Sequence, residues 1–63
     1  MLSNAVFYIE VYWLNAAYEI RYLDFDGAIL YTELLTTVSS ALFAQWKRSY
    51  KNLLRITDYT RGD

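Results

Sequence analysis

Hydrophobic and polar residues alternate in the first part of the chain, which indicates an extended conformation. In the run VFYIEVYWL, residues 6–14, positions 7, 9, 11 and 13 are Phe, Ile, Val and Trp, whereas positions 8, 10 and 12 are Tyr, Glu and Tyr. Successive side chains of a β-strand point to opposite faces of the sheet. We therefore predict that residues 6–14 form a strand with one apolar face and one amphipathic face.

Two further segments have the same character. The run YEIRYLDF, residues 18–25, alternates aromatic or aliphatic residues with Glu and Arg, which predicts a second strand. The segment AILYTELL, residues 28–35, is also typical of a strand and places Glu33 on the same face as Tyr31. The tripeptide NAA at 15–17 is a weak turn signal. An alternative interpretation makes residues 15–24 a short helix that is capped by Asn15.

The periodicity changes after Thr36. The segment TTVSSALFAQWKRSYKN, residues 36–52, offers Thr37 or Ser39 as an N-cap and gathers basic residues near its end, where cations complement the helix dipole. It predicts one helix, and LLRITDY, residues 53–59, predicts a final strand. The order of elements predicts a single α+β domain over residues 1–63, with a small antiparallel sheet of about four strands (β-β-β-α-β) and the helix packed on one face.

The predicted helix has two candidate contact faces. Phe43, Trp46 and Tyr50 recur at the spacing i, i+3, i+7. A second line, about 100° around the helix, contains Val38, Leu42, Gln45 and Ser49. One four-stranded sheet cannot bury both lines equally, so we expect at least one of them to contact another chain. The alternative is that Phe43 and Trp46 simply widen the face that covers the sheet.

Length and composition favour self-association. A chain of 63 residues buries only roughly 60% of the surface that its unfolded form exposes. Small domains are usually stabilised further by disulfides, a metal or a partner subunit, and this sequence has no Cys and no His. It does have two Trp, seven Tyr and three Phe, more aromatic residues than a small core holds. We therefore predict a homodimer, with a crowded monomeric core as the alternative.

The charge is unevenly distributed along the chain. Residues 1–40 carry five acidic residues against Arg21, a balance of −4, whereas residues 41–63 carry five basic residues against Asp58 and Asp63, a balance of +3. This asymmetry suggests two differently charged surfaces. The longest uncharged run, residues 34–46, is too short for a membrane span, and no secretory signal is expected. Together with the absence of Cys, these features predict a cytoplasmic protein with no membrane partner.

The stretch YLDFDGAILYTE, residues 22–33, resembles motif I of the haloacid dehalogenase superfamily. That resemblance would make Asp24 a nucleophile and Asp26 an acid/base. The 36 residues after Gly27 cannot build the parallel α/β sheet that this chemistry requires. Asp-Gly between two strand-like runs is instead a strong hairpin signal. Two carboxylates are also too few for a calcium site. We predict no catalysis, no metal and no cofactor.

A second resemblance covers residues 17–59, AYEIRYLDFDGAILYTELLTTVSSALF…NLLRITDY. The order of an acidic turn ending in Gly, an aromatic strand with Glu33 and a Ser-capped helix with Phe43 is similar to the small dimeric uracil-DNA glycosylase inhibitors of tailed phages. The resemblance implies a homodimer that mimics DNA and inserts aromatic side chains into the enzyme's apolar pocket. This sequence has Ala44 where the family has an acidic residue, and Lys47 lies nearest the position of the family's later helix Tyr.

The favoured hypothesis is a non-catalytic inhibitor of uracil-DNA glycosylase, located in the host cytoplasm if the chain is viral. Its predicted contact residues are the helix aromatics and four acidic residues: Phe43, Trp46, Tyr50, Glu33, Asp24, Asp26 and Glu19. One alternative is a single-stranded nucleic-acid-binding module that uses Lys47, Arg48 and Lys51, although the near-neutral charge makes nucleic acid an unlikely partner. Another alternative is a structural or oligomerising interaction domain.

Overall fold

The computed structural model describes residues 5–61 and contains four strands and one helix. The elements are β1 (Tyr8–Leu14), β2 (Ala17–Leu23), β3 (Ile29–Leu35), α1 (Ser40–Ser49) and β4 (Arg55–Asp58). The α+β class and the order β-β-β-α-β are therefore confirmed. The alternative of a helix over residues 15–24 is wrong, because most of that segment forms β2.

The sheet has the strand order β3-β2-β1-β4 and is mixed rather than antiparallel. The pairs β1–β2 and β2–β3 are antiparallel, as expected, but β4 runs parallel to β1. The expectation of an all-antiparallel sheet is wrong for this last strand. A helix-containing crossover allows two strands to run in the same direction, and α1 carries the chain from the β3 edge to the β4 edge in this way.

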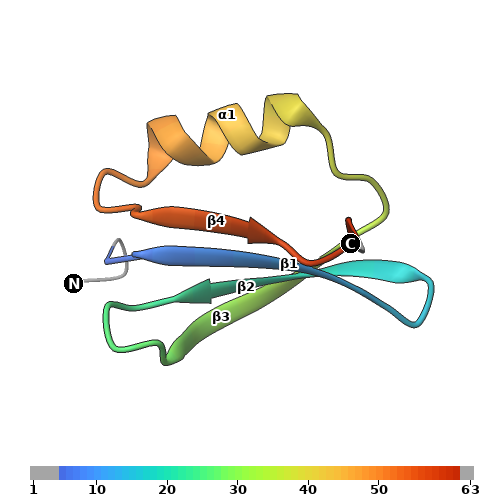
Figure 1. Ribbon diagram of the computed structural model, residues 1–63, viewed down its shortest axis with the longest axis horizontal. Coiled ribbons are helices and arrows are strands. Elements are labelled where there is room, and N and C mark those ends of the chain that lie inside the picture. Colours follow the sequence, from blue (N-terminus) through green and yellow to red (C-terminus); the bar gives the residue numbers. More distant parts are fainter. Residues whose placement is uncertain (1–4, 62–63) are drawn as a thin grey trace.

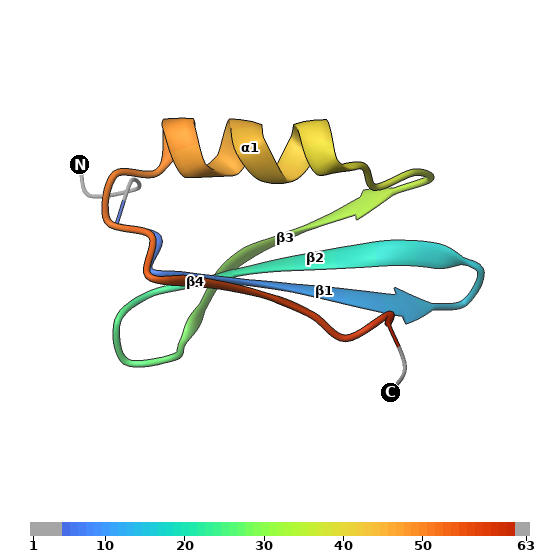
Figure 2. The ribbon, with the colours of Figure 1, turned by 45° about the horizontal axis from the view of Figure 1, so that its top comes forward.

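The molecule has two layers, with α1 lying along one face of the sheet (Figures 1 and 2). Strand alternation turns Ile9, Val11 and Ile20 toward α1, and these side chains are completely buried. They form the core together with Val6, Tyr22 and Trp46. Fully burying an aliphatic side chain stabilises a fold by about 1.5–3 kcal/mol. The core is therefore small, and the large side chains of α1 complete it.

Local signals fix the ends of α1. The Ser39 side chain accepts a hydrogen bond from the backbone N–H of Leu42 at 3.4 Å, which confirms Ser39 rather than Thr37 as the N-cap. At the other end, the backbone N–H of Tyr50 donates to the Trp46 carbonyl at 2.9 Å. Lys47 and Arg48 lie in the last turn, where their charges complement the helix dipole.

The two hairpins use different turns. Asn15 and Ala16 connect β1 to β2 with φ values of 53° and 62°, the left-handed conformation of a two-residue primed turn. The DFDG segment connects β2 to β3, and Gly27 has a φ of 88°, which glycine adopts without strain. The hairpin interpretation of this segment is therefore confirmed.

Candidate functional site

The face of the sheet opposite α1 is not covered by any element in residues 5–61 (Figure 2). Strand alternation and the pairing register place a group of tyrosines, arginines and glutamates on it. We define the open face as Tyr8, Glu10, Tyr12, Glu19, Arg21, Arg55 and Tyr59. Exposed or half-buried aromatic and charged side chains of this kind are candidates for binding rather than for core packing.

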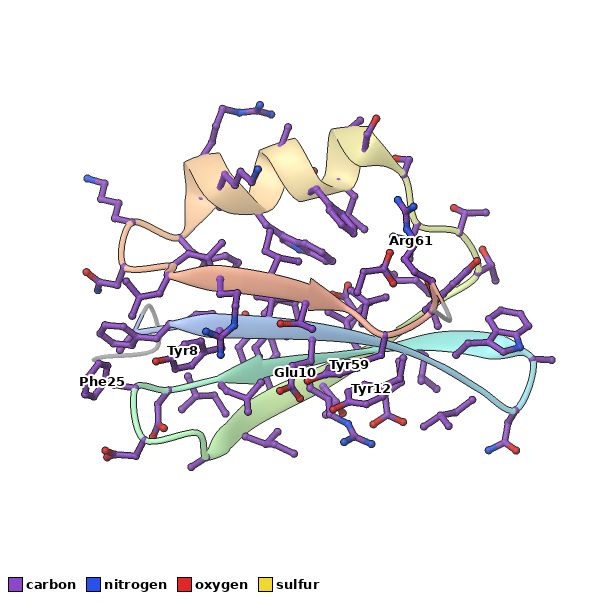
Figure 3. All side chains as sticks on the ribbon, viewed as in Figure 1. Tyr8, Glu10, Tyr12, Phe25, Tyr59 and Arg61 are labelled. Atoms are coloured by element: carbon purple, nitrogen blue, oxygen red, sulfur yellow. The ribbon has the colours of Figure 1, made fainter. Side chains whose placement is uncertain are left out.

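Tyr12 is the centre of the open face. The Arg21 guanidinium carbon lies 4.0 Å from the centroid of the Tyr12 ring, a cation–π contact. The Tyr59 ring stacks on Tyr12 with 5.0 Å between the ring centroids and 17° between the planes. Arg21 comes from β2 and Tyr59 follows β4, which flank β1 on opposite sides. Figure 3 shows Glu10, Tyr12 and Tyr59 close together.

Hydrogen bonds fix the polar ends of these side chains. The Tyr12 hydroxyl donates to Glu10 Oε1 at 2.7 Å, and Arg21 Nε donates to Glu19 Oε2 at 2.7 Å. Partial burial raises the pKa of Tyr12, and the hydrogen bond to Glu10 raises this pKa further. Tyr12 therefore remains a protonated donor at neutral pH. Both glutamates have a partner on the protein itself, so neither presents an unpaired carboxylate.

A second cation–π contact lies at the other end of β1. The Arg55 guanidinium carbon is 5.0 Å from the centroid of the Tyr8 ring, and the two residues are directly opposite in the β1–β4 register. Nearby, the rings of Phe7 and Phe25 meet edge to face at 5.2 Å. Arg61 takes part in neither contact. Its side chain points away from Tyr8 and Phe25 (Figure 3), and its Nε donates to Asp58 Oδ2 at 3.3 Å. The open face thus extends along β1 from Tyr8 to Tyr12.

The aromatic residues predicted on α1 face the sheet. Trp46 is only 4% exposed, and its ring stacks on Phe43 at 5.3 Å. Phe43 and Tyr50 are half-buried against the core. The Tyr50 hydroxyl is 2.5 Å from the Tyr31 hydroxyl. This line of the helix covers the core together with Val38 and Leu42 of the other line, as in the alternative interpretation. Gln45 and Ser49 of that other line are exposed.

The four predicted acidic residues lie in three different places. Glu19 is on the open face, and Glu33 is on β3, where its carboxylate accepts a hydrogen bond from the Tyr22 hydroxyl at 2.6 Å. Asp24 and Asp26 are in the turn between β2 and β3. Asp24 Oδ1 accepts from the backbone N–H of Asp26 and of Ala28, each at 2.9 Å, so this carboxylate organises the turn. The structure does not bring these acids together into one surface.

The alternative nucleic-acid site is also divided. Lys47, Arg48 and Lys51 are exposed around the C-terminal end of α1. Trp46, the ring beside them in sequence, is buried against the sheet and offers no free face for a base. A shallow cleft near this end of α1 is lined mainly by aliphatic and basic residues: Lys47, Leu53, Leu54, Arg55 and Ile56.

Within residues 5–61, no group of three or more Asp, Glu, His or Cys side chains is placed to hold a metal ion. In the same residues, no helix has the length and apolar character needed to cross a membrane.

Sequence reasoning missed the open face as a site, although the signal for part of it was present. The alternation of residues 6–14 already placed Tyr8, Glu10 and Tyr12 on one side of a strand. Their neighbours Arg55 and Tyr59 come from the end of the chain, and only the parallel pairing of β4 with β1 brings them there. No local pattern in the sequence predicts that pairing.

Comparisons with known proteins do not assign the chain to a family. No protein-family model matches it, no curated protein is similar to it, and no solved structure matches its fold.

Proposed function

We propose that this chain is a small non-catalytic protein-binding module whose contact surface is the open face. The observation that carries the proposal is Tyr12, held between the Arg21 guanidinium and the Tyr59 ring on a face that no other element of residues 5–61 covers. Tyrosine and arginine are enriched at the energetic centres of protein interfaces. Rigid aromatic side chains also lose little conformational entropy when a partner binds.

The charge of the open face favours a protein over a nucleic acid. Glu10 and Glu19 balance Arg21 and Arg55, so these four charges sum to zero. Binding to a phosphate backbone depends on an excess of Lys and Arg. The basic residues Lys47, Arg48 and Lys51 lie at the end of α1, on the layer that covers the opposite face. A neutral surface with aromatic centres and paired charges is typical of a protein interface.

Affinity capture from a bacterial lysate treated with nuclease tests this proposal. The intact protein is expected to retain a protein partner, and Tyr59→Ala, which removes a side chain that is 55% exposed, is expected to weaken that retention at least tenfold. Lys51→Ala, an exposed change near the end of α1, is the matched control and is expected to retain the partner. Equal capture by the Tyr59 and Lys51 variants would place the contact elsewhere. Capture from an untreated lysate that is lost after nuclease treatment would support the nucleic-acid alternative.

The resemblance over residues 17–59 supports a narrower proposal, in which the partner is uracil-DNA glycosylase and a homodimer of this chain mimics DNA. Glu19 and Asp26 are accessible to such an enzyme, whereas Trp46 is buried. Because the DNA-binding cleft of a glycosylase is positive, an acidic contact surface is required. Titration of glycosylase activity with the purified protein tests this partner. Full enzyme activity at a saturating concentration of this protein would exclude uracil-DNA glycosylase as the partner. The partner of the open face would then be a different protein.

A further inference from the structure

β3 is an edge strand with an unusually apolar and accessible surface. It is the first strand in the order β3-β2-β1-β4, so one side of its backbone has no neighbour within the sheet. Six of its seven residues are exposed. Its apolar side chains include Ile29 at 52%, Leu30 at 41% and Leu34 at 70% exposure. A long, apolar edge of this kind is a template for pairing with another strand.

β3 lacks most of the features that usually prevent such pairing, and its one irregularity is at its start, where the register against β2 shifts between Tyr22 and Leu23 and leaves Leu30 without a partner. Its sequence, ILYTELL, contains no Lys, Arg, Pro or Gly. The only charged residue is Glu33, and its carboxylate accepts a hydrogen bond from Tyr22 of the neighbouring strand. This charge is therefore directed toward its own sheet rather than toward solvent beyond the edge. Natural edge strands that stay unpaired are commonly short, bulged or charged.

The opposite edge of the sheet has these protective features. β4 is only four residues long, and it carries Arg55 at one end and Asp58 at the other. β3 is therefore the edge that is open to an additional strand.

The direction of the backbone groups on β3 follows from the first hairpin. In a two-residue hairpin, the residues that flank the turn, here Leu14 and Ala17, exchange both backbone hydrogen bonds. Alternate residues of β2 from Ala17 onward therefore bond to β1, and the residues between them, such as Ile20 and Tyr22, bond to β3. Thr32 lies between the partners of these two residues. Its backbone N–H and C=O consequently point outward from the edge.

The sequence of β3 is self-complementary about Thr32. In an antiparallel pair of two β3 strands centred there, Thr32 lies opposite Thr32 and forms a hydrogen-bonded pair. Leu30 then lies opposite Leu34, and Tyr31 lies opposite Glu33 on the helix side. A register centred one residue later would place two Glu33 carboxylates directly opposite each other, which is unfavourable. Charge and apolar pairing therefore both select the register about Thr32.

We infer that the chain forms a homodimer in which β3 pairs antiparallel with β3 of a second copy, centred on Thr32. The two four-stranded sheets become one continuous sheet. The two-fold axis runs perpendicular to this sheet, so both helices lie on one side and both open faces lie on the other. Leu30 and Leu34 of the two copies cover one another in this arrangement. The inference does not rest on the open face, because Tyr59 does not belong to β3 and its replacement leaves this edge unchanged, but it does supply an interface for the homodimer of the narrower proposal.

Sedimentation equilibrium of three proteins tests the interface. The wild type is expected to have twice the chain mass of 7.5 kDa, and Leu34→Lys is expected to have the single-chain mass. Leu54→Lys is the matched control, because Leu54 is 63% exposed but adjoins β4, and this variant is expected to stay dimeric. Circular dichroism establishes that each variant is folded. A monomeric wild type, or a folded Leu34→Lys dimer, would overturn the inference.

Cysteine cross-linking tests the register, since the sequence has no Cys of its own. In the proposed register, two Thr32 Cα atoms lie about 5.5 Å apart, within the span of a disulfide. Thr32→Cys is therefore expected to give a covalent dimer on oxidation. Two Leu34 positions lie roughly 13 Å or more apart, so Leu34→Cys is expected to remain uncross-linked. Cross-linking of Leu34→Cys, with none for Thr32→Cys, would contradict the register.

Discussion

The Tyr22 hydroxyl donates a hydrogen bond of 2.6 Å to Glu33 Oε1 and so joins the buried strand β2 to the edge strand β3. Tyr22 is 2% exposed and contacts three other aromatic rings. Glu33, in contrast, lies at the exposed edge. The bond links a core residue to the only charged residue of β3, and it holds the Glu33 carboxylate toward β2.

Tyr22→Phe is expected to lower the free energy of unfolding by about 1 kcal/mol, because the hydrogen bond to Glu33 is lost while the ring packing stays. A double-mutant cycle with Glu33→Ala, followed by urea denaturation at a fixed protein concentration, measures the coupling between the two side chains. A coupling energy near zero would show that the bond does not contribute to stability.

Alkaline pH is expected to destabilise the fold. Burial raises the pKa of Tyr22 above its ordinary value of 10.0, and the hydrogen bond to Glu33 raises it further. Burial and the hydrogen bond with Tyr31 raise the pKa of Tyr50 in the same direction. The unfolded chain therefore loses these protons first, so the free energy of unfolding is fully retained below pH 10 and falls as the pH rises through the folded-state values.

Urea denaturation across a series of alkaline pH values measures this decline. Tyr22→Phe is expected to reduce its slope, because one of the tyrosines with a raised pKa is removed. Tyr59→Phe removes an exposed tyrosine and is expected to retain the full slope. A decline of equal slope in all three proteins would contradict the assignment to Tyr22.

Periodicity predicted the elements of this fold because their signals are local. The alternation in residues 6–14, the Asp-Gly turn and the Ser39 cap each depend on a few adjacent residues, and each is present in the structure. The direction of β4 is a different kind of property. It depends on where α1 returns the chain to the sheet, and the four residues of β4 contain no pattern that distinguishes parallel from antiparallel pairing.

The same limit explains why the candidate site was only partly predictable. Tyr12 and Tyr59 are 47 positions apart, yet their rings stack because β4 pairs with β1. Helix periodicity also could not decide which line of α1 faces the sheet. The structure buries Trp46 and leaves Gln45 and Ser49 exposed, because burying a large aromatic ring removes much more apolar surface from water than burying a polar side chain.

Trp46 is expected to be a determinant of folding rather than a contact residue. Truncation of a buried aromatic side chain costs about 3–5 kcal/mol, which is comparable to the total stability of a small domain. Trp46→Ala is therefore expected to be largely unfolded by circular dichroism, and Trp46→Phe to remain folded with a lower melting temperature. Lys47→Ala, at the next and exposed position, is expected to melt close to the wild type. A fully stable Trp46→Ala variant would contradict the packing described for α1.

The two aspartates of the DFDG turn are expected to differ in their effect on stability. Asp24 accepts two backbone hydrogen bonds, whereas Asp26 is exposed and accepts none among the hydrogen bonds described for residues 5–61. Asp24→Ala is expected to lower the free energy of unfolding by about 1 kcal/mol, because two turn amides lose their acceptor. Asp26→Ala is expected to change it by less than about 0.5 kcal/mol. Equal effects in chemical denaturation would show that Asp24 does not organise the turn.

The turn between β1 and β2 contains a strained residue whose replacement is expected to stabilise the protein. Ala16 has a φ of 62°, and a residue with a Cβ atom in the left-handed region costs about 1 kcal/mol relative to glycine. Ala16→Gly creates the Asn-Gly sequence that primed turns favour, so we expect the free energy of unfolding to rise by up to about 1 kcal/mol. Asn15→Gly is the matched control, with a smaller expected gain because Asn tolerates this conformation. If thermal denaturation shows Ala16→Gly to be less stable than the wild type, the conformation assigned to this turn is incorrect.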